Sequence, residues 1–322
     1  NNSIFKKIFT FDPVIFIICL LIVFSNIYGA GFSDDIDHYH YGYISNTDSV
    51  NYIWGNSFLH PLYGTSPIWL TFQSYLNFDN SILQDIHVTN GIIFFLILGL
   101  FVTELKSKKK LSFYLPIIFA ILIFLLLKYT RLKEFGIDRP ATLLFCFMLY
   151  YYLKYFVITK KVNLLPNFII LSFISVSVVL IKITYLPILI LPLFVFINYR
   201  KQLLEVDTRY LLFFLPILAL ILKNLLSTGC LIFPVEKSCI DFISWSNLSG
   251  TKEFSIFTES FNKSWTSYKG DLSNEEYLKS FNWFFTWFER VKFELLEFAL
   301  TIILVSVLTF LSFGIQIKKF NF

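Results

Sequence analysis

Residues suited to acid–base chemistry are concentrated in a short segment after the first apolar stretch of the chain. Asp34, Asp35 and Asp37 lie there beside His38 and His40. A loop that only joins two membrane spans needs neither paired carboxylates nor histidines. A carboxylate at the boundary of lipid and water can act as a general base, and several together can hold a divalent cation. These residues are therefore candidates for catalysis or metal binding.

The residues of this segment have two candidate roles, catalysis and metal binding. The candidate catalytic residues are Asp35, Asp34, Asp37 and His40. If a metal ion takes part, Mg²⁺ or Mn²⁺ is the expected ion, and its candidate ligands are Asp35, Asp37 and His38. The alternative is that these acids have no role beyond being tolerated on the outer side of the membrane.

Cations occur at other connections that the charge pattern places on the same side. One apolar stretch is preceded by the cations Arg131 and Arg139, with the carboxylate of Asp138 directly before Arg139. Another apolar stretch is interrupted by Lys182. Cations near the ends of spans suit a phosphate or pyrophosphate group. The competing interpretation is that they only anchor helix ends.

The elements that position these residues are membrane-spanning helices. The chain has 56% hydrophobic and 15% charged residues, with a mean hydropathy of +0.66. A soluble globule of this composition would expose far too much apolar surface. The sequence predicts an integral, all-α membrane protein, a polytopic bundle of about eight spans that forms a single domain over residues 1–322. The predicted spans are Phe11–Tyr28, Ile86–Leu105, Leu111–Leu127, Pro140–Ile158, Leu164–Ile181, Ile183–Ile197, Tyr210–Leu226 and Phe293–Phe313.

Positive charge sets the orientation of this bundle. Lysine and arginine residues fall on alternate connections, which places both termini in the cytoplasm. The opposite side receives two large loops, at about 31–85 and 227–292, and a tight turn around Lys182. The net charge of +5 mostly reflects the cytoplasmic anchors, so nucleic acid is not an expected partner.

Interfacial helices are expected inside both outer loops. Ser66 and Pro67 can begin one that carries Trp69. A second begins at Ser273, where Glu276 completes a capping box and an aromatic face follows. The stretch 244–269 is polar and shows no strong period. Cys230 and Cys239 share the second loop, and they either form a disulfide in an oxidising compartment or are unpaired thiols.

Several energy-coupling and hydrolytic motifs are absent from the sequence. There is no Walker A loop, HExxH, GxSxG or GxGxxG motif. No internal repeat of the kind found in many secondary transporters is visible.

Short motifs along nearly the whole chain are similar to those of a known superfamily. They are Asp35-x-x-x-Tyr39-His40, the stretch Leu59 to Trp69, Asp138-Arg139-Pro140, Leu180 to Pro187, and Asn224 to Pro234. With an Asp-bearing outer loop after the first span, this pattern resembles the GT-C superfamily of membrane glycosyltransferases. The closer similarity is to a group of bacterial polytopic membrane proteins with an Asn-Leu-His segment, in which Phe58 here replaces the Asn.

The resemblance implies roles for individual residues. Asp35 would deprotonate the acceptor hydroxyl or bind a metal that does so. Arg139 and Lys182 would bind the departing polyprenyl phosphate, with Arg131 and Asp138 nearby. His40 and His60 would orient the acceptor or the sugar. Trp69 would stack on a sugar face, unless it is an interfacial anchor.

The resulting hypothesis is a membrane glycosyltransferase of the bacterial inner membrane. It would move a sugar from a polyprenyl-phosphate-linked donor to an envelope glycan or lipid acceptor on the extracytoplasmic side, with membrane lipids as its surroundings. One alternative is a transporter or flippase for lipid-linked saccharides, which should have more polar residues at mid-membrane. Another is a non-catalytic subunit of an envelope polysaccharide assembly complex.

Overall fold

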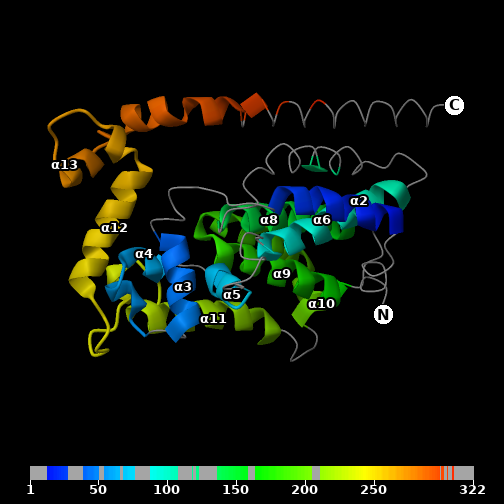
Figure 1. The fold of residues 1–322 in the computed structure, drawn as a ribbon, viewed down its shortest axis with the longest axis horizontal. Coiled ribbons are helices and arrows are strands. Elements are labelled where there is room, and N and C mark those ends of the chain that lie inside the picture. Colours follow the sequence, from blue (N-terminus) through cyan, green and yellow to red (C-terminus); the bar gives the residue numbers. More distant parts are fainter. Residues whose placement is uncertain are drawn as a thin grey trace. The chain divides into compact units, whose positions relative to one another are not determined.

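The chain folds into two compact units in this computed structural model, Asn1–Tyr52 with Ser66–Leu220 and Ile53–Thr65 with Ile221–Phe322. The structure describes residues 13–27, 39–50, 54–65, 68–76, 88–107, 118, 121–122, 136–158, 164–204, 211–297, 299–300, 303 and 307. Within these ranges the chain is helical and has no β-strand, which confirms the all-α prediction (Figure 1).

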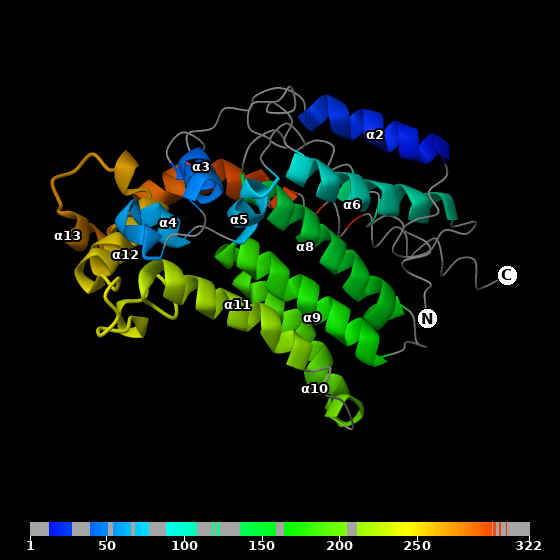
Figure 2. The same cartoon turned by 60° about the horizontal axis from the view of Figure 1, so that its bottom comes forward.

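Helix α9 (Leu164–Ile181) is central to the first unit. Its apolar stretch is 61% buried, against 39% for the stretch that begins at Asp138 and 17% for the stretch that begins at Ile183. Helix α8 (Asp138–Tyr152) continues into a π-helical turn, η5 (Leu153–Ile158), and packs on one side of α9. Helix α10 (Ile190–Leu204) packs on another side of α9 (Figure 2).

The chain reverses direction between α9 and α10. Lys182 has an extended backbone, with φ −146° and ψ 110°, and a 3₁₀-helix, η6 (Ile183–Leu189), follows it. Pro187 lies inside η6, where its missing N–H and fixed φ prevent a regular α-helix. Phe168, near the start of α9, contacts Phe196 of α10. The two helices therefore run antiparallel, as the predicted turn at Lys182 requires.

A second helix pair in this unit is formed by α2 (Pro13–Ile27) and α6 (Val88–Ser107), which lie side by side (Figure 2). Ile27 contacts Gly91, where an added Cβ would lie 2.8 Å from the isoleucine Cδ1. The absence of a side chain at position 91 thus permits the close approach of the helices. Cys19 and Val23 pack with Phe94 in the core of this pair.

Two shorter helices, α3 (Tyr41–Val50) and α5 (Ile68–Ser74), also belong to the first unit. They pack against each other, and the hydroxyl groups of Tyr43 and Thr71 lie 2.9 Å apart. Helix α5 also contacts α9. Burial of the Tyr43 phenol raises its pKa.

The second unit is built around the last turns of α11 (Leu211–Thr228). A 3₁₀ turn, η2 (Asn56–Phe58), and the short helix α4 (Pro61–Thr65) pack together, and Gly55 N donates to Leu226 O at 2.8 Å. After α11 come η8 (Glu236–Ser238), α12 (Leu248–Asn262), η9 (Trp265–Ser267) and α13 (Asn274–Leu278). A further helical run covers 284–297.

Apolar helices of the described residues coincide with most of the predicted spans. Three are long and apolar enough to cross a membrane, Asp138–Val157, Leu164–Ile181 and Ile183–Leu203. Three shorter apolar helices are Pro13–Ile27, Thr89–Leu105 and Ile217–Thr228. The predicted spans 111–127 and 293–313 lie largely outside the described residues. These apolar helices agree with the predicted class, a membrane protein. The count of eight spans stays a prediction.

Two expectations for the second outer loop need correction. The stretch 244–269 is not aperiodic, because α12 lies within it and buries Thr251 and Phe254. The capping box at Ser273 and Glu276 is confirmed, but the helix that it begins ends at Leu278. Ser280 and Phe281 have positive φ angles of 51° and 64°, which break the helix before the chain becomes helical again at 284.

Candidate functional site at the Asp138–Lys182 pair

The polar cluster of interest lies at one end of the first unit, where α8 begins and α9 ends. Lys182 Nζ is 2.5 Å from Asp138 Oδ1, and the side chains are 31% and 52% exposed. Asp138 is in the first turn of α8, where a carboxylate is favoured by the helix dipole. The helix dipole therefore favours the position of Asp138, and both side chains of the pair are accessible to a ligand.

A second link joins the same two segments. Thr142 and Tyr185 bring their hydroxyl groups within 3.0 Å, and Thr142 also donates to Asp138 O at 2.7 Å. The ring of Tyr185 lies 5.3 Å from that of Phe145. These contacts hold the turn after α9 against the start of α8, and they place Lys182 beside the first turn of α8.

Trp69 supports this end of the unit from α5. Its indole is buried against Ala141 and Ile181, and its Nε1 donates to Asn90 Oδ1 at 3.0 Å. Asn90 is fully buried near the start of α6, and its Nδ2 lies 3.5 Å from Gly136 O. Tryptophan and asparagine thus connect α5, α6 and the segment before α8. Trp69 is buried in this structure rather than presented at the surface.

Four of the predicted substrate-binding residues are therefore brought to one end of the first unit. Asp138, Arg139 and Lys182 come from the segments that meet there, and Trp69 packs against them through Ala141 and Ile181. Arg139 directly follows Asp138 and is half-buried. Among the residues that the structure describes here, Arg139 and Lys182 supply two cations beside the carboxylate of Asp138, and cations suit an anionic group.

The two histidines lie in different units. His40 is buried just before α3, with its ring 4.2 Å from the ring of Tyr39. His60 belongs to the second unit, where it is half-buried before α4 and its Nδ1 accepts from Leu62 N at 3.3 Å.

The remaining predicted site residues, Asp34, Asp35, Asp37, His38 and Arg131, lie outside the described residues. Within the described ranges, no group of three or more His, Cys, Asp or Glu side chains could hold a metal ion. The metal hypothesis depends on Asp35, Asp37 and His38, so it stays a prediction.

Gln73 is a buried polar residue that was not among the predicted site residues. It lies four residues after Trp69 on α5, so both side chains project from the same side of the helix. It is 1% exposed, and neither atom of its amide has a hydrogen-bond partner among the residues that the structure describes. An unsatisfied buried amide is costly, which makes it a candidate for contact with a polar ligand. The signal available in the sequence was the presence of a polar glutamine in a helix that has an apolar face.

The second unit contains a separate polar contact. Lys223, near the end of α11, donates from Nζ to Gly64 O at 2.8 Å. An added Cβ at Gly64 would lie 2.8 Å from Thr228 Cγ2 and 2.9 Å from Phe233 Cε1. Lysine and glycine thus fix α4 against α11, and this role explains why a cation occurs in an otherwise apolar helix.

Comparison with known proteins identifies a family that matches the chain. The matching family is described as a domain of unknown function, DUF8201, and the match covers residues 2–322. No curated protein and no solved structure matches the chain. Because the family match extends over nearly all of its length, the chain belongs to the DUF8201 family.

Proposed function

We propose that this protein is a membrane-integral glycosyltransferase with a GT-C-like bundle of about eight spans. It transfers a sugar from a polyprenyl-phosphate-linked donor to an envelope glycan or lipid acceptor on the extracytoplasmic side of a bacterial inner membrane. The observation that carries the proposal is the Asp138–Lys182 pair, with Arg139 beside it, at one end of apolar helices. A lipid-linked phosphate needs cations at that level, because its chain is in the bilayer and its phosphate is at the surface.

The orientation is supported by the distribution of the other charges. The opposite end of the same helices carries the ion pair of Glu104 with Lys154, and Lys201 follows on α10. Basic clusters on the connections at that end favour the cytoplasm. The start of α8, the end of α9 and the start of α6 would then face the extracytoplasmic side, together with the Asp35 segment that precedes α3.

The proposed reaction is a displacement at the anomeric carbon of the donor. Asp35 accepts the proton of the acceptor hydroxyl, directly or through a metal ion, and the acceptor oxygen forms the new bond. The bond between the anomeric carbon and the phosphate oxygen breaks, and the polyprenyl phosphate leaves with the electron pair. Lys182 and Arg139 stabilise the charge that develops on the phosphate. Asp138 holds the lysine in place before the donor binds.

Gln73 gives this proposal a candidate for sugar recognition. A glutamine amide can donate to one hydroxyl group and accept from another. Trp69 on the same side of α5 contributes packing beneath the Asp138–Lys182 pair rather than an exposed stacking surface. The substrate would thus restore hydrogen bonds that the amide of Gln73 lacks in the described structure.

Two serines of α9 favour this reading over a transport pathway, whereas the buried hydroxyl of Ser172 has no hydrogen-bond partner in the described structure. Ser175 Oγ donates to Leu171 O and Ser177 Oγ donates to Phe173 O, each at 2.8 Å within the same helix. Hydroxyl groups that serve their own backbone do not present a hydrophilic path. Among the described residues of the first unit, the solvent-accessible charged side chains lie at the ends of the apolar helices.

The test is sugar transfer by the purified full chain in proteoliposomes with candidate polyprenyl-phosphate sugars and acceptors, followed by product mass. Asp35→Asn should reduce turnover by about 10²- to 10⁴-fold, because it keeps the shape and removes the base or metal charge. Asp34→Asn is the matched control and should have a smaller effect. Wild-type turnover that survives Asp35→Asn unchanged would exclude the mechanism. Donor movement across the bilayer without product would instead identify a flippase.

A further inference from the structure

The segment between Cys230 and Cys239 is a closed loop with an apolar exterior. A disulfide and an isolated antiparallel bridge join its two ends. Leu231, Ile232 and Val235 are 41%, 58% and 49% exposed, and Phe242 just beyond the loop is 90% exposed. Large apolar side chains gathered on one small loop are unusual on a surface that faces water, and they indicate contact with another apolar phase.

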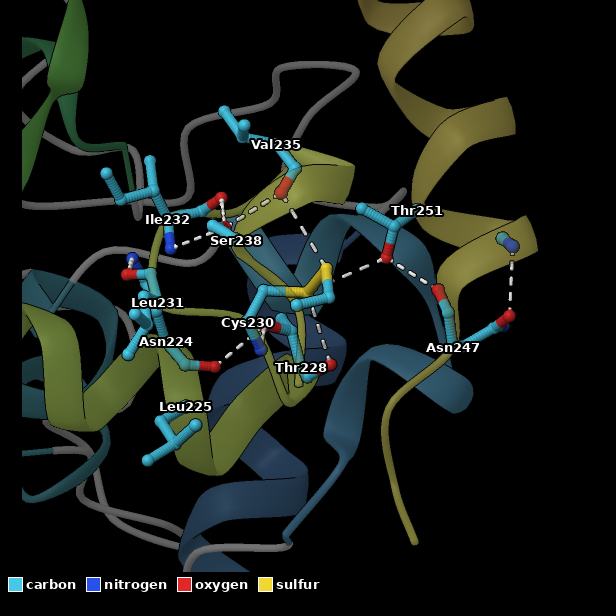
Figure 3. Close-up of a disulfide and its surroundings, with 12 residues drawn as sticks. Asn224, Leu225, Thr228, Cys230, Leu231, Ile232, Val235, Ser238, Asn247 and Thr251 are labelled. Carbon is cyan, nitrogen blue, oxygen red and sulfur yellow. Dashed lines mark hydrogen bonds between the residues drawn. A yellow bond between two sulfur atoms is a disulfide. The ribbon is translucent and has the colours of Figure 1, made fainter. Parts of the chain in front are cut away.

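Several backbone groups of the loop are hydrogen-bonded within the loop or to the end of α11. Ser238 is central to them (Figure 3): its hydroxyl accepts from Ile232 N at 3.0 Å and lies 2.7 Å from both Ile232 O and Val235 O. Leu231 N donates to Ser238 O, Val235 N donates to Ile232 O, and Asn224 Nδ2 donates to Leu231 O. In water, solvent would satisfy these groups. In lipid they must be satisfied within the protein.

The opposite side of the loop is fixed to the rest of the second unit. Cys230 is fully buried, and its N–H donates to Thr228 Oγ1 at 3.1 Å (Figure 3). Thr251 of α12 contacts the sulfur of Cys230, and the ring of Phe233 stacks on Phe254 at 5.4 Å. The disulfide side therefore faces α11 and α12. This leaves the apolar side chains of Leu231, Ile232 and Val235 on the outside.

The position of the loop identifies what it contacts. It begins directly after α11, whose Leu215, Leu218 and Leu222 are about half exposed at helical spacing. Such a stripe on an apolar helix faces lipid. The loop begins two residues beyond the end of α11, in the same compact unit as Leu222. Its charged residues, Glu236 and Lys237, are exposed and limit the depth of the loop to the headgroup region.

We propose that the loop from Cys230 to Cys239 is a membrane-contacting element that inserts Leu231, Ile232 and Val235 into the lipid interface beside the end of α11. The disulfide closes the loop and implies an oxidising compartment, so the contacted leaflet is the extracytoplasmic one. This inference depends on membrane insertion of α11 and not on glycosyl transfer. It would hold for a transporter or a scaffold subunit with the same fold.

The experiment is photocrosslinking from defined positions of the full chain in proteoliposomes of phosphatidylethanolamine and phosphatidylglycerol. The photoreactive amino acid p-benzoylphenylalanine replaces Ile232 or Val235 and, as a matched control, Lys252, which is exposed on α12. Mass spectrometry then identifies what each position captures. Lipid adducts at 232 and 235 and none at 252 are expected.

Two results would overturn the proposal. Absence of lipid adducts at 232 and 235 would mean that the loop faces water, and capture of a second polypeptide would make it a protein-docking surface. Thiol alkylation before and after reduction shows whether each variant retains the disulfide, so a misfolded loop is recognised. Sugar transfer by the same samples is scored separately, which keeps failure of this proposal distinct from failure of the proposed activity.

Discussion

Lys182 Nζ lies 2.5 Å from Asp138 Oδ1, although the two residues are 44 positions apart in the chain. The contact joins the first residue of α8 to the residue that directly follows α9. It forms because the two helices run antiparallel, so that the start of α8 and the end of α9 lie at the same level. Tyr151 and Asn167 form a matching contact of 2.5 Å at the other end of the pair. The buried contact therefore fixes the register of the helices, and the exposed ion pair is available for a ligand.

Removal of the Lys182 charge should affect activity far more than stability. A partly exposed ion pair contributes about 0.2–1 kcal/mol to the free energy of unfolding. Loss of a cation that stabilises a departing phosphate reduces turnover by about a hundredfold. We expect Lys182→Met to show the second effect with little change in thermal unfolding, and Lys182→Arg to retain most of the turnover. Initial rates over a range of donor concentrations provide the measurement.

The control for that experiment is Lys201→Met, which removes an exposed cation at the end of α10. It should leave both donor use and unfolding unchanged. Equal losses from the Lys182 and Lys201 substitutions would mean that general charge, and not the Asp138–Lys182 pair, determines donor use.

Gln73→Leu should separate stability from function. The substitution removes a buried amide whose polar atoms lack partners in the described structure and keeps a similar volume. Relief of this desolvation should raise the free energy of unfolding by about 1–3 kcal/mol. Sugar transfer should fall, because the substrate loses a donor and an acceptor. Thermal unfolding in detergent and turnover in proteoliposomes measure the two effects, and a stabilised variant with full turnover would remove Gln73 from the site.

The apolar pattern of the sequence was sufficient to predict the apolar helices described in the first unit, but it did not predict the polar helix α3. The predicted span Leu164–Ile181 has the same limits as α9, because uninterrupted apolar residues end at Lys182 and Pro187 prevents a continuous helix. The charge pattern placed Asp138, Arg139 and Lys182 on one side of the membrane. It did not predict the direct Asp138–Lys182 contact, because pairing of α8 with α9 is a tertiary property that hydropathy does not report.

Other features had weak or misleading local signals. Helix α12 was missed because its exposed polar residues mask the spacing of Thr251, Phe254 and Thr258 in a hydropathy profile. The break after α13 was missed because Ser280 and Phe281 adopt positive φ angles without glycine or asparagine at either position. Tyr277 explains this break in physical terms. It is fully buried and donates to Lys263 O, so it packs toward the end of α12 and cannot belong to the aromatic face that was predicted.

Gly64→Ala should destabilise the second unit. The new methyl group would meet Thr228 and Phe233 at under 3 Å, and it would disturb the carbonyl that accepts from Lys223. Overpacking of this kind costs about 1–3 kcal/mol. We expect a lower unfolding temperature and faster proteolysis of the chain. Thr65→Ala is the matched control, since Thr65 is exposed and its hydroxyl donates to Leu62 O within α4. Equal stability of the two variants would contradict the close packing at Gly64.

Acidification should loosen α13 before α12. The Glu276 carboxylate accepts from Ser273 Oγ at 2.7 Å and from Ser273 N at 3.0 Å, and these hydrogen bonds hold its pKa below the usual value. Because the folded pKa is lower than the unfolded one, the contribution of Glu276 to helix stability is complete above the ordinary glutamate pKa of about 4.3. It is lost as the pH falls through the folded pKa.

The first turn of α12 is capped by Asn247, which accepts from Gly250 N at 2.9 Å and does not titrate. Hydrogen exchange, corrected for the intrinsic rate at each pH, should therefore show protection that declines in α13 and is constant in the first turn of α12. A parallel decline in both turns, or the same decline in Glu276→Gln, would mean that the capping box is not the cause.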